Sequence, residues 1–132
     1  MKKKILVVDD DFKIRTTMAH ILEYEGYSVS LAEDGISALR SLGNDEFDVL
    51  ITDIRMPTMD GIELFNHVKK LYPQMQVIFI TGSTYINTAL KGLEDVTFFY
   101  FEKPVNFNLL ICALEHIFEI KKCVPEVKKL RK

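Results

Sequence analysis

The sequence predicts an α/β protein with a doubly wound (βα)5 architecture, in which helices cover both faces of a five-stranded parallel sheet. Short runs of apolar and β-branched residues, too short for helices, alternate five times with segments whose apolar residues have helical spacing. Strands that are apolar throughout are typical of parallel sheets buried on both faces. Right-handed crossovers then limit the topology to a doubly wound sheet.

Five apolar runs are the predicted strands. Most of their central residues are Val, Ile, Leu or Phe, as in Val77-Ile78-Phe79-Ile80, and each run is too short to form a helix. The predicted strands are Ile5–Asp9, Tyr27–Ala32, Asp48–Asp53, Gln76–Thr81 and Thr97–Glu102.

Five segments have the apolar spacing of a helix. The predicted helices are Phe12–Glu25, Gly35–Leu42, Asp60–Tyr72, Thr84–Leu93 and Asn106–Lys122. Asp60 and Glu63 match a capping box, Pro73 stops the third helix, and Asp11 is expected to cap the first rather than to bind metal. The fourth helix is the poorest, because Thr, Asn and Gly are weak helix formers.

Length and charge exclude several classes of protein. A chain of 132 residues fits one domain, and a net charge of −2 does not support a protein that coats nucleic acid. No apolar run approaches a membrane span, and the run after Lys4 is too short for a signal peptide. The two cysteines, Cys112 and Cys123, form no CxxC motif or Cys/His cluster, so reduced thiols and a cytoplasmic location are expected.

Polar residues follow four of the predicted strands. The first ends in Asp9-Asp10-Asp11, Asp53 ends the third, Thr81 ends the fourth and Lys103-Pro104 follows the fifth. In a doubly wound sheet these strand ends share one edge, where the functional crevice lies. Two carboxylates about 5 Å apart repel by roughly 3 kcal/mol at an effective dielectric constant of 20. Such a cluster should take up a proton or a divalent cation.

The ligand types indicate phosphoryl chemistry. Oxygen ligands without His or Cys favour Mg²⁺ or Mn²⁺, and Mg²⁺ in proteins commonly partners phosphate. A carboxylate can itself act as a nucleophile and form an aspartyl phosphate. The Lys103 ammonium and the Thr81 hydroxyl could then hold the phosphoryl oxygens.

In the order and spacing of these motifs, the chain resembles the receiver domain of bacterial two-component response regulators from about Lys3 to Lys122. The matching pieces are Val7-Val8-Asp9-Asp10, Ile51-Thr52-Asp53-Ile54-Arg55-Met56-Pro57, Asp60-Gly61, Ile80-Thr81-Gly82 and Lys103-Pro104. The resemblance implies a flavodoxin-like sheet of strand order 2-1-3-4-5. It also implies a cis bond between Lys103 and Pro104. Val96-Thr97 departs from the Gly-Ala that the family often has.

The resemblance also implies a role for each residue of the site. Asp53 would accept a phosphoryl group from a histidine kinase or phosphotransfer protein, while Lys103 would pair with that group. Asp9, Asp10, Asp53 and the Arg55 carbonyl would bind Mg²⁺, with Asp9 acting through water. Thr81 and Tyr100 would be the switch pair. They would change the surface of helix four, strand five and helix five, which could bind a partner or a second receiver.

Two other protein classes share part of this pattern. A haloacid-dehalogenase-like phosphatase would share the early aspartates, Thr81 and a later Lys, but it needs a late acidic pair that is missing after Lys103. A flavodoxin-like FMN binder needs a Ser/Thr/Gly-rich anion cradle after strand one, where the three aspartates of this chain would repel the phosphate.

Residues 1–122 are expected to form the receiver domain. Residues 123–132 would be a basic tail or the start of a linker. Nucleic acid would be bound only through an output domain outside this chain.

Overall fold

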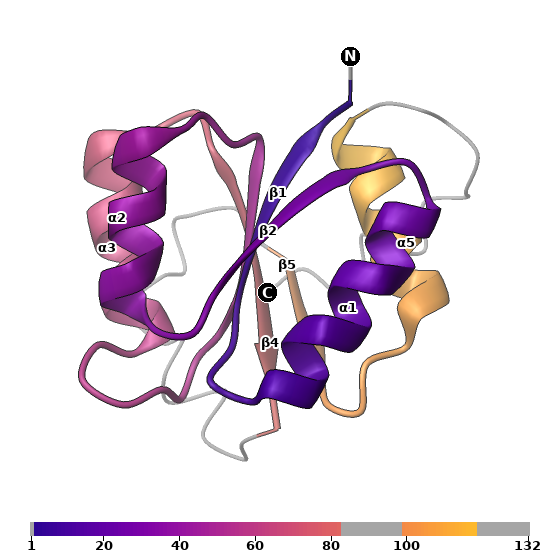
Figure 1. The fold of residues 1–132 in the computed structure, drawn as a ribbon, viewed down its shortest axis with the longest axis horizontal. Helices are drawn as coiled ribbons and strands as arrows, with labels where there is room; N and C mark the ends of the chain where they lie inside the picture. The colour runs from indigo at the N-terminus through magenta and orange to yellow at the C-terminus, as the bar shows by residue number, and fades with distance from the viewer. Residues whose placement is uncertain (1, 83–98, 119–132) are drawn as a thin grey trace.

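The computed structural model describes residues 2–82 and 99–118 and places a five-stranded sheet at the centre of the molecule (Figure 1). The strand order is β2-β1-β3-β4-β5, and all four pairings are parallel. The strands are β1 (Lys4–Val8), β2 (Ser28–Ala32), β3 (Val49–Asp53), β4 (Gln76–Thr81) and β5 (Phe99–Glu102). The predicted fold class and strand order are confirmed.

Helices cover both faces of this sheet, with α1 and α5 on one side and α2 and α3 on the other (Figure 1). They are α1 (Phe12–Tyr24), α2 (Gly35–Asn44), α3 (Gly61–Leu71) and α5 (Phe107–Ile117). The helix predicted over Thr84–Leu93 lies outside the described residues. The last helix was expected to reach Lys122, but α5 ends at Ile117 with Phe118 as its C-cap, and nothing beyond Phe118 is described.

Strand β1 shows why the central strands are mostly apolar. Ile5 and Val7 pack in the core on the α1/α5 side, whereas Leu6 and Val8 pack in the core on the α2/α3 side. All four side chains are at most 1% exposed. Because successive side chains of a strand point to opposite faces, burial of both faces requires an apolar residue at every position. Each such side chain contributes about 1.5–3 kcal/mol through burial.

Acidic or amide side chains cap the four described helices at their N-termini. Asp11 accepts from the Lys13 and Ile14 amides at 2.9 and 3.2 Å, so its predicted capping role is confirmed. The predicted capping box of Asp60 and Glu63 is also present. Each cap follows a strand, so the caps hold the loops at the carboxyl edge of the sheet in place.

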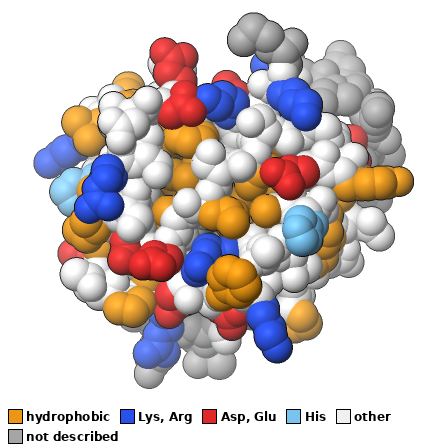
Figure 2. All heavy atoms as spheres, in the orientation of Figure 1, with side chains coloured by type: hydrophobic (Ala, Val, Ile, Leu, Met, Phe, Trp, Pro, Cys, Tyr) orange, Lys and Arg blue, Asp and Glu red, His pale blue; other side chains and the backbone are white. Residues whose placement is uncertain are grey.

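The outer surface carries no dominant charge on the face shown in Figure 2, where acidic and basic side chains are interspersed. This distribution agrees with the small net charge of −2. No helix within residues 2–82 and 99–118 is long and apolar enough to cross a membrane.

The cysteines depart from the sequence-based expectation. Cys112 is half-buried on α5 and is disulfide-bonded in this structure. The prediction of two reduced thiols is therefore wrong for Cys112, and Cys123 lies outside the described residues.

Tyr27, which precedes β2, makes stability sensitive to alkaline pH. Burial, together with Glu115 and Glu25, raises the pKa of Tyr27 to about 12. An unfolded tyrosine titrates near 10, so this contribution is complete below about pH 10 and is lost as the pH rises towards 12. We expect the free energy of unfolding to fall by roughly 2 kcal/mol over this window.

Urea denaturation of the wild type and of Tyr27→Phe, at about pH 9 and about pH 11.5, measures this effect. The loss should be smaller in Tyr27→Phe by the contribution of Tyr27. Tyr24→Phe, which changes a side chain that is 89% exposed, should behave like the wild type. Equal losses in the wild type and Tyr27→Phe would contradict the prediction.

Candidate functional site

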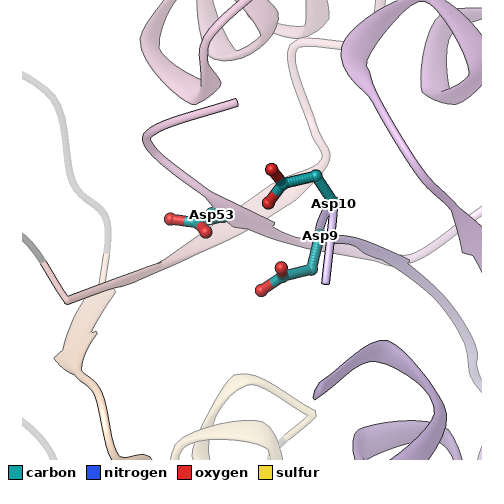
Figure 3. Close-up of side chains that lie close together, drawn as sticks. All are labelled: Asp9, Asp10 and Asp53. Carbon is teal, nitrogen blue, oxygen red and sulfur yellow. The ribbon is translucent and has the colours of Figure 1, made fainter. Parts of the chain in front are cut away.

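Three carboxylates converge at the carboxyl edge of the sheet, and we call Asp9, Asp10 and Asp53 the carboxylate cluster. Each offers one oxygen, and these oxygens lie within 4.8 Å of one another. Figure 3 shows the three side chains projecting from the neighbouring ends of β1 and β3. Asp9 and Asp53 are buried, at 2% and 7% exposed, whereas Asp10 is open to solvent. Two carboxylates of the cluster are therefore buried, and the third is accessible to solvent.

Lys103 supplies the positive charge of the site. Its Nζ lies 2.8 Å from Asp53 Oδ2 and 3.0 Å from Asp9 Oδ2, so one ammonium bridges the ends of β1 and β3. The Lys103 amide donates to the Thr81 carbonyl at 2.8 Å, which extends the β4–β5 pairing by one residue. The Lys103–Pro104 peptide bond is cis, as predicted.

Backbone amides orient the two buried carboxylates. The Asp11 amide donates to Asp9 Oδ1 at 2.9 Å, and the Arg55 amide donates to Asp53 Oδ1 at 3.3 Å. The Arg15 guanidinium donates to the Asp9 carbonyl at 2.9 Å and so joins α1 to the end of β1. In both carboxylates, Oδ1 faces the backbone while Oδ2 faces Lys103.

Burial and hydrogen bonds have opposing electrostatic effects in the site. Burial raises the pKa of Asp9 above its ordinary value, although the Asp11 amide and Lys103 partly offset the rise. For Lys103, burial alone would lower the pKa, but hydrogen bonds to Asp53 and Asp9 outweigh it and the pKa is raised. Lys103 therefore stays cationic at neutral pH. One ammonium among three carboxylates leaves a formal charge of −2, which favours a divalent cation.

Gly61 was not identified as a site residue from the sequence, yet it shapes the strand end that carries Asp53. Its amide donates to the Ile54 carbonyl at 2.7 Å, which draws the start of α3 against the end of β3. A Cβ atom on Gly61 would lie 2.2 Å from the Asp53 carbonyl oxygen. The capping box placed Gly61 at the start of a helix, but its contact with Asp53 depends on the packing of α3.

The predicted switch residues lie on the two neighbouring strands. Thr81, fully buried, ends β4 next to Glu102 of β5. Tyr100, half-buried, pairs with Phe79 along the strands and packs against the α2/α3-side core. Arg55 is exposed and is tied to the site through its amide. The structure thus brings Asp9, Asp10, Asp53 and Lys103 into one cluster and places Thr81 and Tyr100 on adjacent strands.

A hollow of ≈ 520 Å³ opens beside Lys103. It is lined by Lys13 and Ile14 of α1, by Phe107 at the start of α5, and by Pro104 and Val105 of the segment that precedes α5. Nearby on α1, Phe12 is 67% exposed. The site is therefore bordered by a largely apolar surface on its α1/α5 side.

Comparisons with known proteins agree with this geometry. The family model described as the response regulator receiver domain matches residues 5–115. The chain is 38% identical over 110 residues to the transcriptional regulatory protein ZraR of Klebsiella oxytoca, covering 83% of this chain and 25% of that protein. It is 30% identical over 126 residues to the response regulator MprA of Mycobacterium bovis, covering 96% of this chain and 54% of that protein. The chain thus spans between a quarter and about half of these curated relatives.

Solved structures show the same similarity. A response regulator receiver domain protein from Clostridium thermocellum superposes with a TM-score of 0.81 at 32% identity, covering 91% of this chain and 97% of that one. The response regulator TrrA of Thermotoga maritima, solved in complex with Mg²⁺-BeF, has a TM-score of 0.77 at 29% identity, covering 87% and 98%.

These matches do not support the haloacid-dehalogenase alternative. The family model spans most of the chain, and the strand order agrees with the one that the resemblance implied. The chain therefore belongs to the receiver domain family of response regulators, which are phosphorylation-controlled signalling domains.

Proposed function

We propose that Asp53 is the phosphoacceptor of this domain and that the donor is the phosphohistidine of a kinase or phosphotransfer protein. The observation that carries the proposal is the Lys103 ammonium, which lies 2.8 Å from Asp53 Oδ2 within a cluster of three carboxylates. A lysine so placed can neutralise the charge of an incoming phosphoryl group.

The transfer exchanges one bond for another. An Asp53 carboxylate oxygen attacks the phosphorus, an O–P bond forms, and the P–N bond to the donor histidine breaks with its electron pair returning to the imidazole. Lys103 and the Thr81 hydroxyl would hold the phosphoryl oxygens on Asp53. The partner would approach from the solvent-open side, where Asp10 is exposed.

The donor set fits Mg²⁺, since it consists of oxygens with a net negative charge. Asp10, Asp53 and the Arg55 carbonyl would hold the ion directly, and Asp9 would act through water. Bound there, Mg²⁺ offsets the charge of the phosphoryl group; Mn²⁺ could substitute because it accepts the same ligands.

Phosphorylation of Asp53 would change the conformation of Thr81 first and then that of Tyr100. Movement of the Thr81 hydroxyl towards a phosphoryl group would free space into which Tyr100 can turn. The surface of residues 84–93, β5 and α5 would change and bind a partner or a second copy of the domain. Hydrogen exchange with and without the phosphoryl mimic beryllofluoride tests this, and equal protection of residues 84–100 in both states, with the mimic bound, would refute it.

The domain would act as a switch, with self-phosphorylation and slow self-dephosphorylation as its only chemistry. Residues 1–122 would form the receiver domain and residues 123–132 a basic tail or linker. The domain would act in the cytoplasm. Any contact with nucleic acid would be made by an output domain outside this chain.

Acetyl phosphate, a small phosphodonor, tests the proposed chemistry without the unidentified kinase. In the presence of Mg²⁺ the intact chain should gain one phosphoryl group by mass spectrometry, and peptide mapping should place it on Asp53. Chelation of Mg²⁺ should prevent the gain. A phosphoryl group on any other residue, or equal labelling after chelation, would refute the proposal.

Mg²⁺ should also stabilise the fold. A ligand that binds only the folded state, at about 100 times its Kd, adds about 2.7 kcal/mol to the free energy of unfolding. Asp10→Asn should lose most of this gain, because Asp10 is an exposed ligand whose replacement leaves the core intact. Asp11→Asn should keep it, since Asp11 caps α1 and Asn is an equally good cap.

Urea denaturation with and without Mg²⁺ measures these gains in the three proteins. An undiminished gain in Asp10→Asn, or a lost gain in Asp11→Asn, would show that the ion is held elsewhere.

A further inference from the structure

Arg15 of α1 holds the backbone that carries the two aspartates after β1. Its guanidinium donates to the Asp9 carbonyl at 2.9 Å, and its amide donates to the Asp11 carbonyl at 3.0 Å. The Asp11 amide in turn donates to Asp9 Oδ1 at 2.9 Å. These three hydrogen bonds join Asp9, Asp11 and Arg15 in a closed loop, and Asp10 is the residue between the first two.

The backbone of Asp10 is therefore held on both sides. A peptide group is planar, so the Asp9 carbonyl and the Asp10 Cα belong to one rigid unit, which the Arg15 guanidinium holds. The next peptide group is held through the Asp11 amide. The Asp10 side chain is exposed, and Figure 3 shows its carboxylate turned towards the side on which Asp53 lies. Hydrogen bonds made by the neighbours of Asp10 thus set the direction of its side chain.

Phe12 restrains the guanidinium that makes this contact. The Phe12 ring is 67% exposed, and Arg15 Cζ lies 5.4 Å from its centre. A guanidinium is planar and its donors point in fixed directions, so an aromatic ring beside it limits the orientations that the donors can adopt. The contact gives a structural reason for a large apolar side chain at this exposed position.

The charge of Arg15 works against the binding of a cation at the carboxylate cluster. Like charges repel, so by charge alone a guanidinium near the site lowers the affinity for a metal ion. Mg²⁺, however, requires ligands in a nearly ideal octahedral arrangement. A favourable effect of Arg15 on Mg²⁺ binding must therefore come from the geometry that it imposes on a ligand.

We propose that Arg15 is a positioning residue for Mg²⁺, which directs the Asp10 carboxylate to the ion by holding the Asp9 carbonyl. The inference rests on the proposed function, in which Asp10 is a direct ligand. Loss of a group that orients a metal ligand commonly lowers metal affinity by about 10–100-fold. Charge and geometry thus predict opposite results when Arg15 is replaced.

Titration of the ¹⁵N-labelled full chain with Mg²⁺, followed through amide chemical shifts, measures the Kd without any phosphodonor. Arg15→Met keeps an unbranched apolar stem but removes the donors and the charge, and its Kd should be about tenfold higher than that of the wild type. Arg15→Lys keeps a cation and a donor and should bind Mg²⁺ nearly as well as the wild type. Arg15→Ala repeats the test with the best helix former and should match Arg15→Met.

Lys13→Met is the matched control, because it removes an exposed cation from the same turn of α1. Its Kd should be equal to that of the wild type or lower, as charge alone predicts. The dispersion of the amide signals shows in the same spectra that each variant is folded.

Failure of the positioning role can be distinguished from failure of the proposed site. Unchanged or tighter binding in Arg15→Met and Arg15→Ala, with binding lost in Asp10→Asn, would overturn the role of Arg15 and leave the site intact. An equal loss in Lys13→Met would also overturn that role, since the effect would not be specific to the contact with Asp9. A wild type that does not bind Mg²⁺, or an Asp10→Asn variant that binds it unchanged, would overturn both proposals.

Discussion

Asp53→Asn is expected to abolish the phosphoryl gain of this domain completely. The substitution removes the carboxylate oxygen that would form the acyl phosphate, and an amide does not replace it as a nucleophile. Lys103 keeps its ion pair with Asp9 at 3.0 Å, so the variant should remain folded. The measurement is the mass of the intact protein after incubation with acetyl phosphate and Mg²⁺, and the wild type should gain one phosphoryl group.

Asp45→Asn is the matched control for this variant. Asp45 is an exposed aspartate at the opposite edge of the sheet, and its replacement should leave phosphorylation unchanged. Circular dichroism of both variants shows whether the fold is retained. A full-yield phosphoryl gain in Asp53→Asn would refute Asp53 as the acceptor.

Gly61→Ala is expected to destabilise the fold by about 3 kcal/mol or more. The added Cβ would lie 2.2 Å from the Asp53 carbonyl oxygen and 2.9 Å from the Ile54 Cα, and backbone atoms cannot turn aside as a flexible side chain can. Relief of the clash requires α3 to move away from β3. That movement would stretch the 2.7 Å hydrogen bond from the Gly61 amide to the Ile54 carbonyl.

Gly43→Ala provides the control, because Gly43 lies in α2 and a Cβ there would meet no atom within 4 Å. In an open helical position Ala is favoured over Gly by up to about 1 kcal/mol, so this variant should be slightly stabilised. Urea denaturation at neutral pH compares the two substitutions. A Gly61→Ala variant as stable as the wild type would show that the end of β3 yields without cost.

Local patterns were sufficient to predict the order of the elements within residues 2–82 and 99–118 and the edge at which the site forms. The apolar run Ile5–Val8 must be a strand covered on both faces, since it is too short for a helix and has no polar side. Parallel strands bring their carboxyl ends together, so Asp9, Asp53 and Lys103 had to converge once the strands were known. The capping roles of Asp11 and Asp60 were predictable because a cap involves only residues two or three positions away.

Long-range packing decided the remaining features. No local pattern shows that one Lys103 ammonium contacts both Asp9 and Asp53, since that geometry depends on the relative positions of three strands. The approach of Gly61 to Asp53 depends on how closely α3 packs on β3. The hydrogen bond from the Tyr72 hydroxyl to the Leu42 carbonyl, 30 residues earlier in the chain, likewise depends on how the ends of α2 and α3 pack together. Sequence patterns determine which residues reach an edge of the sheet, while distances between elements are set by the packing of side chains that are distant in sequence.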